Sequence, residues 1–111
     1  MSGIVGIWNL DGQPVEDKLL ASLSTTISHR GPDGEGRWVE GPVGLACQLM
    51  RVTPESLGET QPLVHSTGVV LVFDGRLDNR EELIDALKSS PGITQETPDP
   101  ALVLAAYIAF G

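Results

Sequence analysis

The chain has little cysteine and histidine, with one cysteine and two histidines among 111 residues. Cys47 alone cannot form an internal disulfide, so we expect a reducing compartment and a buried, inert thiol. A structural zinc site takes about four closely spaced ligands, whereas Cys47, His29 and His65 lie far apart in the sequence. We therefore expect no metal site, and we expect both histidines to be surface or loop residues.

Long apolar runs and an excess of basic residues are also missing. No run approaches the ~20 residues of a membrane-spanning helix, and the apolar start of the chain lacks the basic leader of a signal peptide. Seven Lys and Arg face 15 Asp and Glu, for a formal net charge of −8. Such a chain repels phosphate backbones and anionic lipids. We expect a cytoplasmic protein with neither nucleic acid nor membrane as a partner.

Nucleotide-binding loops are absent as well. No G-x-x-x-x-G-K-S/T segment is present, and the glycines of residues 31–36 stand in the wrong order for a dinucleotide fingerprint. Acidic side chains between those glycines would repel phosphate. The chain on its own is therefore not expected to bind ATP or any other cofactor.

The elements that are present predict a single α+β domain over residues 1–111, with helices over a mainly antiparallel sheet. Residues 69–73 (VVLVF) form the clearest strand, and their continuous apolarity indicates burial on both faces. Asn79 is a candidate cap for one helix, and Thr97 or Asp99 for another, with Pro100 at its first position. A loop is expected over 29–36, a turn at Gly41–Pro42 and a connection over 53–62. We predict strands at 4–8, from 38, at 43–52 and at 69–73, and helices at 15–27 (apolar face Leu19, Leu20, Leu23 and Ile27), 80–88 and 101–110.

Ser2 is the candidate nucleophile. Removal of Met1 would leave Ser2 with a free α-amine, whose pKa is ordinarily about 7.7–8.0. That amine could act as general base for the hydroxyl of the same residue, as in N-terminal nucleophiles. Serine at position 2 is common, so this feature alone identifies nothing.

Several segments, in order along the chain, resemble the motifs of class II glutamine amidotransferase domains of asparagine synthetases. The start SGIVGI resembles M-C-G-I-x-G, and residues 27–34 match I-x-H-R-G-P-D-G. Further on, GLA resembles the start of G-L-A-H-x-R-L, QPL matches Q-P-L/M, and FDGRLDN resembles F-N-G-E-I-Y-N. Thr97–Asp99 with residues 102–107 resembles T-S-D-T-E-V-L-L-x-A-Y.

The resemblance implies the N-terminal-nucleophile (Ntn) hydrolase fold, an αββα sandwich, of which this chain would be the N-terminal part. It implies hydrolysis of glutamine to glutamate and ammonia for a downstream synthetase domain. ATP and Mg would bind only in that missing domain. Cutting the sandwich at Gly111 would leave strand edges bare, so self-association is expected.

The chain departs from the family pattern at the residues that the resemblance assigns to the site. Ser2 replaces the nucleophilic cysteine, and Asp74 replaces the oxyanion-hole asparagine, although Gly75 keeps its N–H. Arg76 replaces a glutamate. Leu49 takes the place of the arginine that binds the substrate carboxylate, and Cys47 that of a histidine, while Arg51 shares the sheet face of Leu49. Asp99, which the resemblance implies holds the α-amino group of glutamine, is retained.

Two hypotheses from different classes follow. In the first, the domain is a non-catalytic structural or docking module, because serine is a poorer nucleophile than cysteine and Asp74 would repel an oxyanion. In the second, it is an active glutaminase that supplies ammonia for asparagine synthesis, with Ser2 either natural or engineered. Residues 50–57 with 78–83 also resemble lasso-peptide cyclases, which activate a side-chain carboxylate and need no ammonia.

Overall fold

The structure is a computed structural model that describes residues 3–50 and 60–111. It is a small mixed α+β domain. None of the helices in these two ranges is long and apolar enough to cross a bilayer. In chain order the elements are β1 (Gly3–Trp8), α1 (Asp17–Thr26), the 3-10 helix η1 (Ser28–Arg30), β2 (Gly34–Glu40), β3 (Val43–Leu49), β4 (Leu63–Val64), β5 (Val70–Leu71), α2 (Arg80–Ala86) and α3 (Asp99–Phe110).

The first three strands form one antiparallel sheet in the order β1-β3-β2. The expected turn between β2 and β3 is present, and Gly41 in it has φ 55, a conformation that glycine adopts without a Cβ penalty. Side chains of β1 alternate between the two faces of the sheet. Val5 and Ile7 pack toward α1, whereas Trp8 remains 71% exposed.

Helix α1 covers one face of this sheet through a small core. Leu20 of the helix is fully buried with Val15 and Ala46, and burying one such leucine stabilises by about 1.5–3 kcal/mol. Gly44 permits the close approach, since a Cβ there would lie 2.9 Å from Val15 Cγ1. A larger residue at position 44 would therefore force the Val15 side chain to shift.

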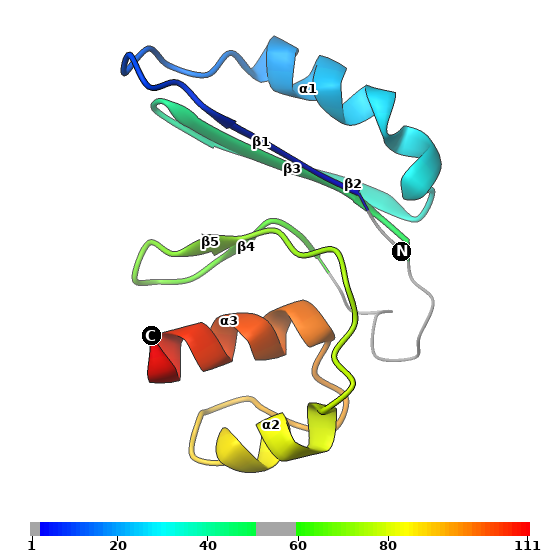
Figure 1. The fold of residues 1–111 in the computed structure, drawn as a ribbon, viewed down its shortest axis with the longest axis vertical. Helices are drawn as coiled ribbons and strands as arrows, with labels where there is room; N and C mark the ends of the chain where they lie inside the picture. Colours follow the sequence, from blue (N-terminus) through cyan, green and yellow to red (C-terminus); the bar gives the residue numbers. More distant parts are fainter. Residues whose placement is uncertain (1–2, 51–59) are drawn as a thin grey trace.

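The remaining elements stack on the other side of the sheet. The β4–β5 hairpin lies opposite α1, α3 lies beyond the hairpin, and α2 is at the far end (Figure 1). The layers thus run helix, sheet, hairpin, helix. The turn after β5 reaches the sheet through Arg30, which pairs with Asp74 of the turn and packs over Gly3 of β1.

The connection before β4 is held against β2 by a second glycine contact. A Cβ on Gly36 would overlap the Gln61 carbonyl and lie 3.1 Å from Pro62 Cδ. The Gln61–Pro62 peptide bond is cis. This contact links the two sheets at the end where Cys47 is buried, as predicted for this thiol.

The prediction of a long strand over 69–73, buried on both faces, was wrong. Only Val70 and Leu71 are in β5, and the whole run is half-buried. Its partner in the described residues is the two-residue β4, which the sequence analysis missed. Beyond Leu71, Phe73 bonds to a side chain instead of a strand.

The loop and strand boundaries also need correction. Strand β2 begins at Gly34, inside the loop predicted over 29–36, because β3 supplies its partner from Leu49 onward. Strand β3 ends at Leu49, short of the predicted end at residue 52. Residues 51–59, including most of the expected 53–62 connection, lie outside the described residues.

The helix details differ in two respects. Of the predicted apolar face, Leu20 is buried, as expected, whereas Leu19 and Leu23 are exposed. The other buried residue of α1 is Ser24, whose hydroxyl accepts a 2.8 Å hydrogen bond from Gln48 Nε2. Neither α2 nor α3 has a side-chain cap: the N-cap positions are Asn79 and Pro98, with Asp99 and Pro100 as the first two residues of α3. The Asp99 carboxylate is engaged elsewhere.

Candidate functional site

The start of β1 and the turn after β5 meet at Arg30. The side chain of Arg30 packs over Gly3, where an added Cβ would lie 3.1 Å from Arg30 Cδ. Its guanidinium donates to Asp74 Oδ2 over 3.4 Å. The side chains of Arg30 and Asp74 are 41% and 21% exposed. One arginine of the HRGPDG motif therefore bridges the residue next to Ser2 and the candidate oxyanion position.

The turn that carries Asp74 and Gly75 is set by Gln61. Gln61 is 4% exposed. Its Nε2 donates to the Phe73 carbonyl at 3.0 Å, and its Oε1 accepts from the Phe73 N–H at 2.7 Å. The amide side chain thus makes the pair of bonds that a neighbouring strand would make, one residue before Asp74. No acceptor in the described part of the chain takes the Gly75 N–H, so that donor remains available.

Asp99 connects the same turn to α3. Its Oδ2 accepts from the Leu77 N–H at 2.9 Å, and its Oδ1 forms an ion pair with Arg80 Nη1. Arg80 Nη2 also donates to the carbonyls of Gln95 and Thr97, each at 2.9 Å. Both oxygens of the carboxylate that the resemblance assigns to the substrate are therefore bonded within the chain.

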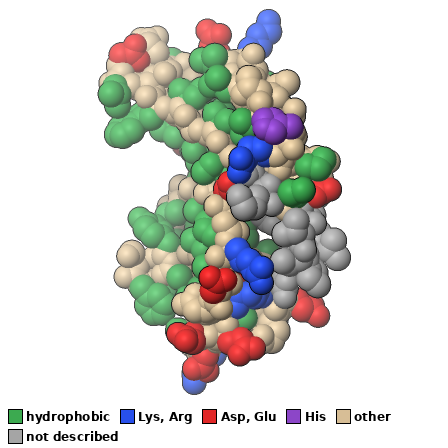
Figure 2. Space-filling view, turned by 45° about the vertical axis from the view of Figure 1, so that its right-hand side comes forward, with side chains coloured by type: hydrophobic (Ala, Val, Ile, Leu, Met, Phe, Trp, Pro, Cys, Tyr) green, Lys and Arg blue, Asp and Glu red, His purple; other side chains and the backbone are tan. Residues whose placement is uncertain are grey.

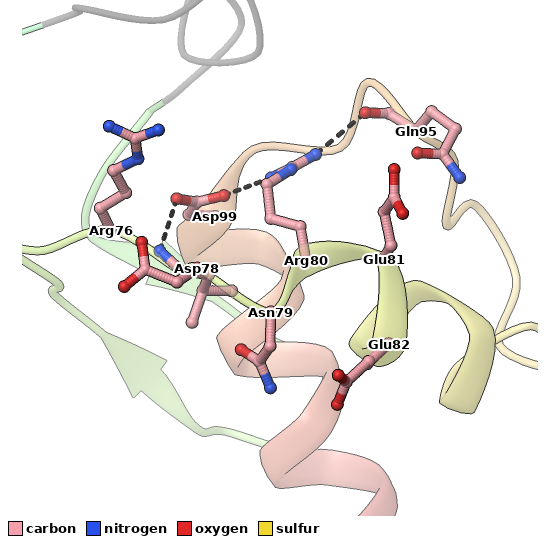
Figure 3. Close-up of a pocket in the computed structure, with 9 residues that line it drawn as sticks. Arg76, Asp78, Asn79, Arg80, Glu81, Glu82, Gln95 and Asp99 are labelled. Carbon is pink, nitrogen blue, oxygen red and sulfur yellow. Dashed lines mark hydrogen bonds and ion pairs between the residues drawn. The ribbon is translucent and has the colours of Figure 1, made fainter.

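A pocket of about 500 Å³ opens beside this ion pair. Figure 3 shows Asp99 near its middle, with Arg80 on one side and Arg76 on the other. Among the described residues Arg76 has no hydrogen-bond or ion-pair partner. The lining consists of residues 76–82 with Gln95 and Asp99.

The charges of this pocket are mixed. Arg76 and Arg80 face four carboxylates, namely Asp78, Glu81, Glu82 and Asp99. Such a pocket does not favour a phosphate, because the carboxylates offset the two cations. In residues 3–50 and 60–111, no group of three or more histidine, cysteine or acidic side chains is placed to hold a metal ion.

The structure brings together four of the six predicted site residues. Asp74, Gly75 and Arg76 follow one another in the turn after β5, and Asp99 bonds to that turn through the Leu77 N–H. Ser2 and Arg51, the other two, lie outside the described residues. Leu49, at the position of the family arginine, is buried in the sheet at 3% exposure.

Three residues that form contacts at the candidate site, Arg30, Gln61 and Arg80, were not identified from the sequence. Arg30 and Gln61 stand inside recognised motifs, and those motifs were the only available signal for them. Arg80 follows a residue interpreted as a helix cap, and nothing in its sequence position indicates an ion pair 19 residues away. Each role depends on a contact between distant segments.

The amino-acid sequence is similar to those of known proteins. A model of the glutamine amidotransferase domain matches residues 1–111. Asparagine synthetase (glutamine-hydrolyzing) 1 of Bacillus subtilis is 27% identical over 111 residues, covering 96% of the chain and 17% of the relative. Asparagine synthetase (glutamine-hydrolyzing) 1 of Arabidopsis thaliana is 34% identical over 92 residues, covering 80% and 15%. The chain thus spans about a sixth of the length of these relatives.

Proposed function

The chain belongs to the glutamine amidotransferase domain family, and from this premise we propose that it is a docking module with a degenerate glutaminase site. Its partner would be an ATP-dependent amide-forming domain of the asparagine synthetase type. The layers of helix, sheet, hairpin and helix would be one part of an αββα sandwich. The observation that carries the proposal is the ion pair of Arg30 with the carboxylate of Asp74, the residue that the resemblance assigns to the oxyanion position.

An oxyanion site works by aiming fixed donors at the negative charge that develops in the transition state. A carboxylate at that position does the opposite. Its ion pair with Arg30 offsets the charge, but it also commits that guanidinium to Asp74 rather than to a substrate. Because loss of a single oxyanion donor lowers kcat by about 10²–10³, Asp74 in place of asparagine argues against efficient glutamine hydrolysis.

Two further residues support a degenerate site. The serine hydroxyl of Ser2 is a much weaker nucleophile at neutral pH than a cysteine thiolate. Leu49 cannot make the bidentate bonds with which an arginine holds a carboxylate, and its side chain is buried. The three differences affect the nucleophile, the oxyanion and the substrate carboxylate separately, so no single replacement would restore the site.

The alternative is an active glutaminase that supplies ammonia for asparagine synthesis. It is favoured by the Gly75 N–H, which donates a hydrogen bond to no described residue and so stays available for an oxyanion. It is also favoured by relatives named as glutamine-hydrolyzing. A lasso-peptide cyclase role would fit the first proposal, because the attacking amine there belongs to the peptide and no ammonia is needed.

Ammonia release from glutamine tests the proposal, with Ser2→Ala as the control for background hydrolysis. We expect the unmodified chain to match that control. The single variant Ser2→Cys should also match it, because Asp74 and Leu49 remain. Release clearly above the Ser2→Ala control by the unmodified chain would establish the glutaminase alternative instead.

A further inference from the structure

We propose that the Arg80 guanidinium binds the Asp99 carboxylate as an internal ligand. By doing so, Arg80 excludes the α-ammonium group of a free amino acid from the neighbouring pocket. The inference rests on the proposed function, in which Asp99 stands at the amino-acid position of a disused site. It assigns Arg80 the role of a specificity-determining residue. The argument comes from how Arg80 is bonded and from what the rest of the pocket offers.

A ligand cannot easily displace Arg80 from the Asp99 carboxylate. The two side chains are only 19% and 18% exposed, so their attraction is screened less than that of a surface pair. The same guanidinium bonds the carbonyls of Gln95 and Thr97. A competing ammonium would have to take over Asp99 while Arg80 stays fixed to this connection. Two cations would then share one carboxylate at close range, which is unfavourable.

Without the Arg80 guanidinium, the pocket would complement an amino-acid zwitterion. Asp99 would offer a carboxylate that is fixed by the Leu77 N–H. Arg76 lines the same pocket on the other side of Asp99 (Figure 3) and lacks a partner in the described residues, so its guanidinium can donate hydrogen bonds to the ligand's carboxylate. A volume of about 500 Å³ is sufficient for a small amino acid. The Arg80 guanidinium alone therefore decides whether this pocket can bind a free amino acid.

Calorimetric titration with L-glutamine tests this role in four proteins. We expect the unmodified chain to show no saturation up to about 20 mM, and Arg80→Met to bind at low millimolar concentration, at least about tenfold tighter. Arg80→Lys keeps a cation at Asp99 but loses the planar fork, and it should behave like the unmodified chain. Arg80→Met combined with Asp99→Asn should lose the binding again. A folded Arg80→Met protein that ignores glutamine overturns the proposal.

Arg80→Met also removes two hydrogen bonds to the 95–97 connection, so a measurement on the unmodified chain is needed as well. The NMR signal of the Arg80 Nε–H group should shift on Asp99→Asn and stay unchanged with glutamine. Movement of that signal by low-millimolar glutamine would overturn the occupancy, even if Arg80→Met does not fold.

The two proposals fail in different ways. Ammonia release by the unmodified chain contradicts the degenerate site. By contrast, an unmodified chain that releases no ammonia, together with a folded Arg80→Met variant that ignores glutamine, contradicts only the role of Arg80.

Discussion

Two side chains at the candidate site, Arg30 and Gln61, join segments that main-chain hydrogen bonds usually join. Arg30 joins the start of β1 to the turn after β5 through Asp74. Gln61 pairs with both backbone groups of Phe73 and so extends the bonding of the hairpin beyond β5. The pair between Arg30 and Asp74 is partly exposed, and such pairs contribute about 0–1 kcal/mol. Gln61 is buried, and its loss should be more damaging.

Replacing Gln61 with leucine should destabilise the fold by about 1–3 kcal/mol, because it leaves the Phe73 N–H and C=O without partners in a partly buried position. For a domain of this size each kcal/mol corresponds to a shift of about 4–8 °C in Tm. Thermal unfolding followed by circular dichroism measures the change. Gln13→Leu, at an exposed position, is the matched control and should stay within about 0.5 kcal/mol. Equal shifts for the two variants would contradict the assigned role of Gln61.

At the scale of elements, the two sheets meet where glycines allow backbones to approach. Gly36 in β2 lies against Gln61 and Pro62, whereas Gly6 in β1 has only ordinary contact room, with an added Cβ 3.4 Å from Leu45 Cδ2. Both glycines lie on the sheet face opposite α1, by the register that pairs Gly6 with Leu45 and Gly36 with Cys47. They therefore form a matched pair for testing the contact.

Gly36→Ala should separate the 61–62 connection from β2, because its Cβ would overlap the Gln61 carbonyl. We expect a loss of stability of at least about 1–3 kcal/mol, the range for overpacked interiors. Gly6→Ala should be close to neutral by comparison. Chemical denaturation of both variants checks the difference, and a Gly36→Ala protein as stable as Gly6→Ala would show that this contact does not hold the two sheets together.

At the scale of the whole molecule, the space between the sheet and the hairpin is open at one end. In the space-filling view the molecule narrows between the half that carries α1 and the half that carries α3, with hydrophobic side chains on both sides of the notch (Figure 2). Ile4 and Trp8 of β1 and Val64 of β4 are among the exposed large hydrophobic residues. Within the described residues no strand pairs with the outer edges of β1 and β2.

Open strand edges and exposed apolar surface favour association, so we expect the isolated chain to dimerise or to bind a complementary chain. The net charge of −8 opposes contact between copies. Salt screens that repulsion, and the dimer fraction should therefore rise with ionic strength. Sedimentation at low micromolar concentration, with and without added salt, measures it. A cooperatively unfolding monomer at all salt concentrations would contradict the prediction.

The isolated chain should not bind ATP. The sequence contains no phosphate loop, and the pocket beside α2 holds twice as many carboxylates as arginines. Calorimetry with Mg-ATP checks this point. Saturable binding at micromolar concentration would mean that a nucleotide site exists which neither the motifs nor the pocket charges indicate.

The amino-acid sequence by itself determined the family, the α+β class and most of the local elements. The strand predicted at 4–8, the helices predicted at 15–27, 80–88 and 101–110 and the turn at Gly41 are all present with slightly different bounds, because local periodicity and turn chemistry act over a few residues. The ordered motifs also assigned Asp74, Gly75, Arg76 and Asp99 to one candidate site, and in the structure Asp99 bonds to the turn that carries the other three.

Only the tertiary structure decided which groups these site residues contact. The pairings of Arg30 with Asp74, Gln61 with Phe73 and Arg80 with Asp99 join positions 44, 12 and 19 residues apart, and local pattern carries no information about such pairs. The same holds for the apolar run at 69–73, whose length as a strand depends on the partner beside it. Strand pairing and ion pairing are contacts between distant segments, so their outcome is settled only when the chain has folded.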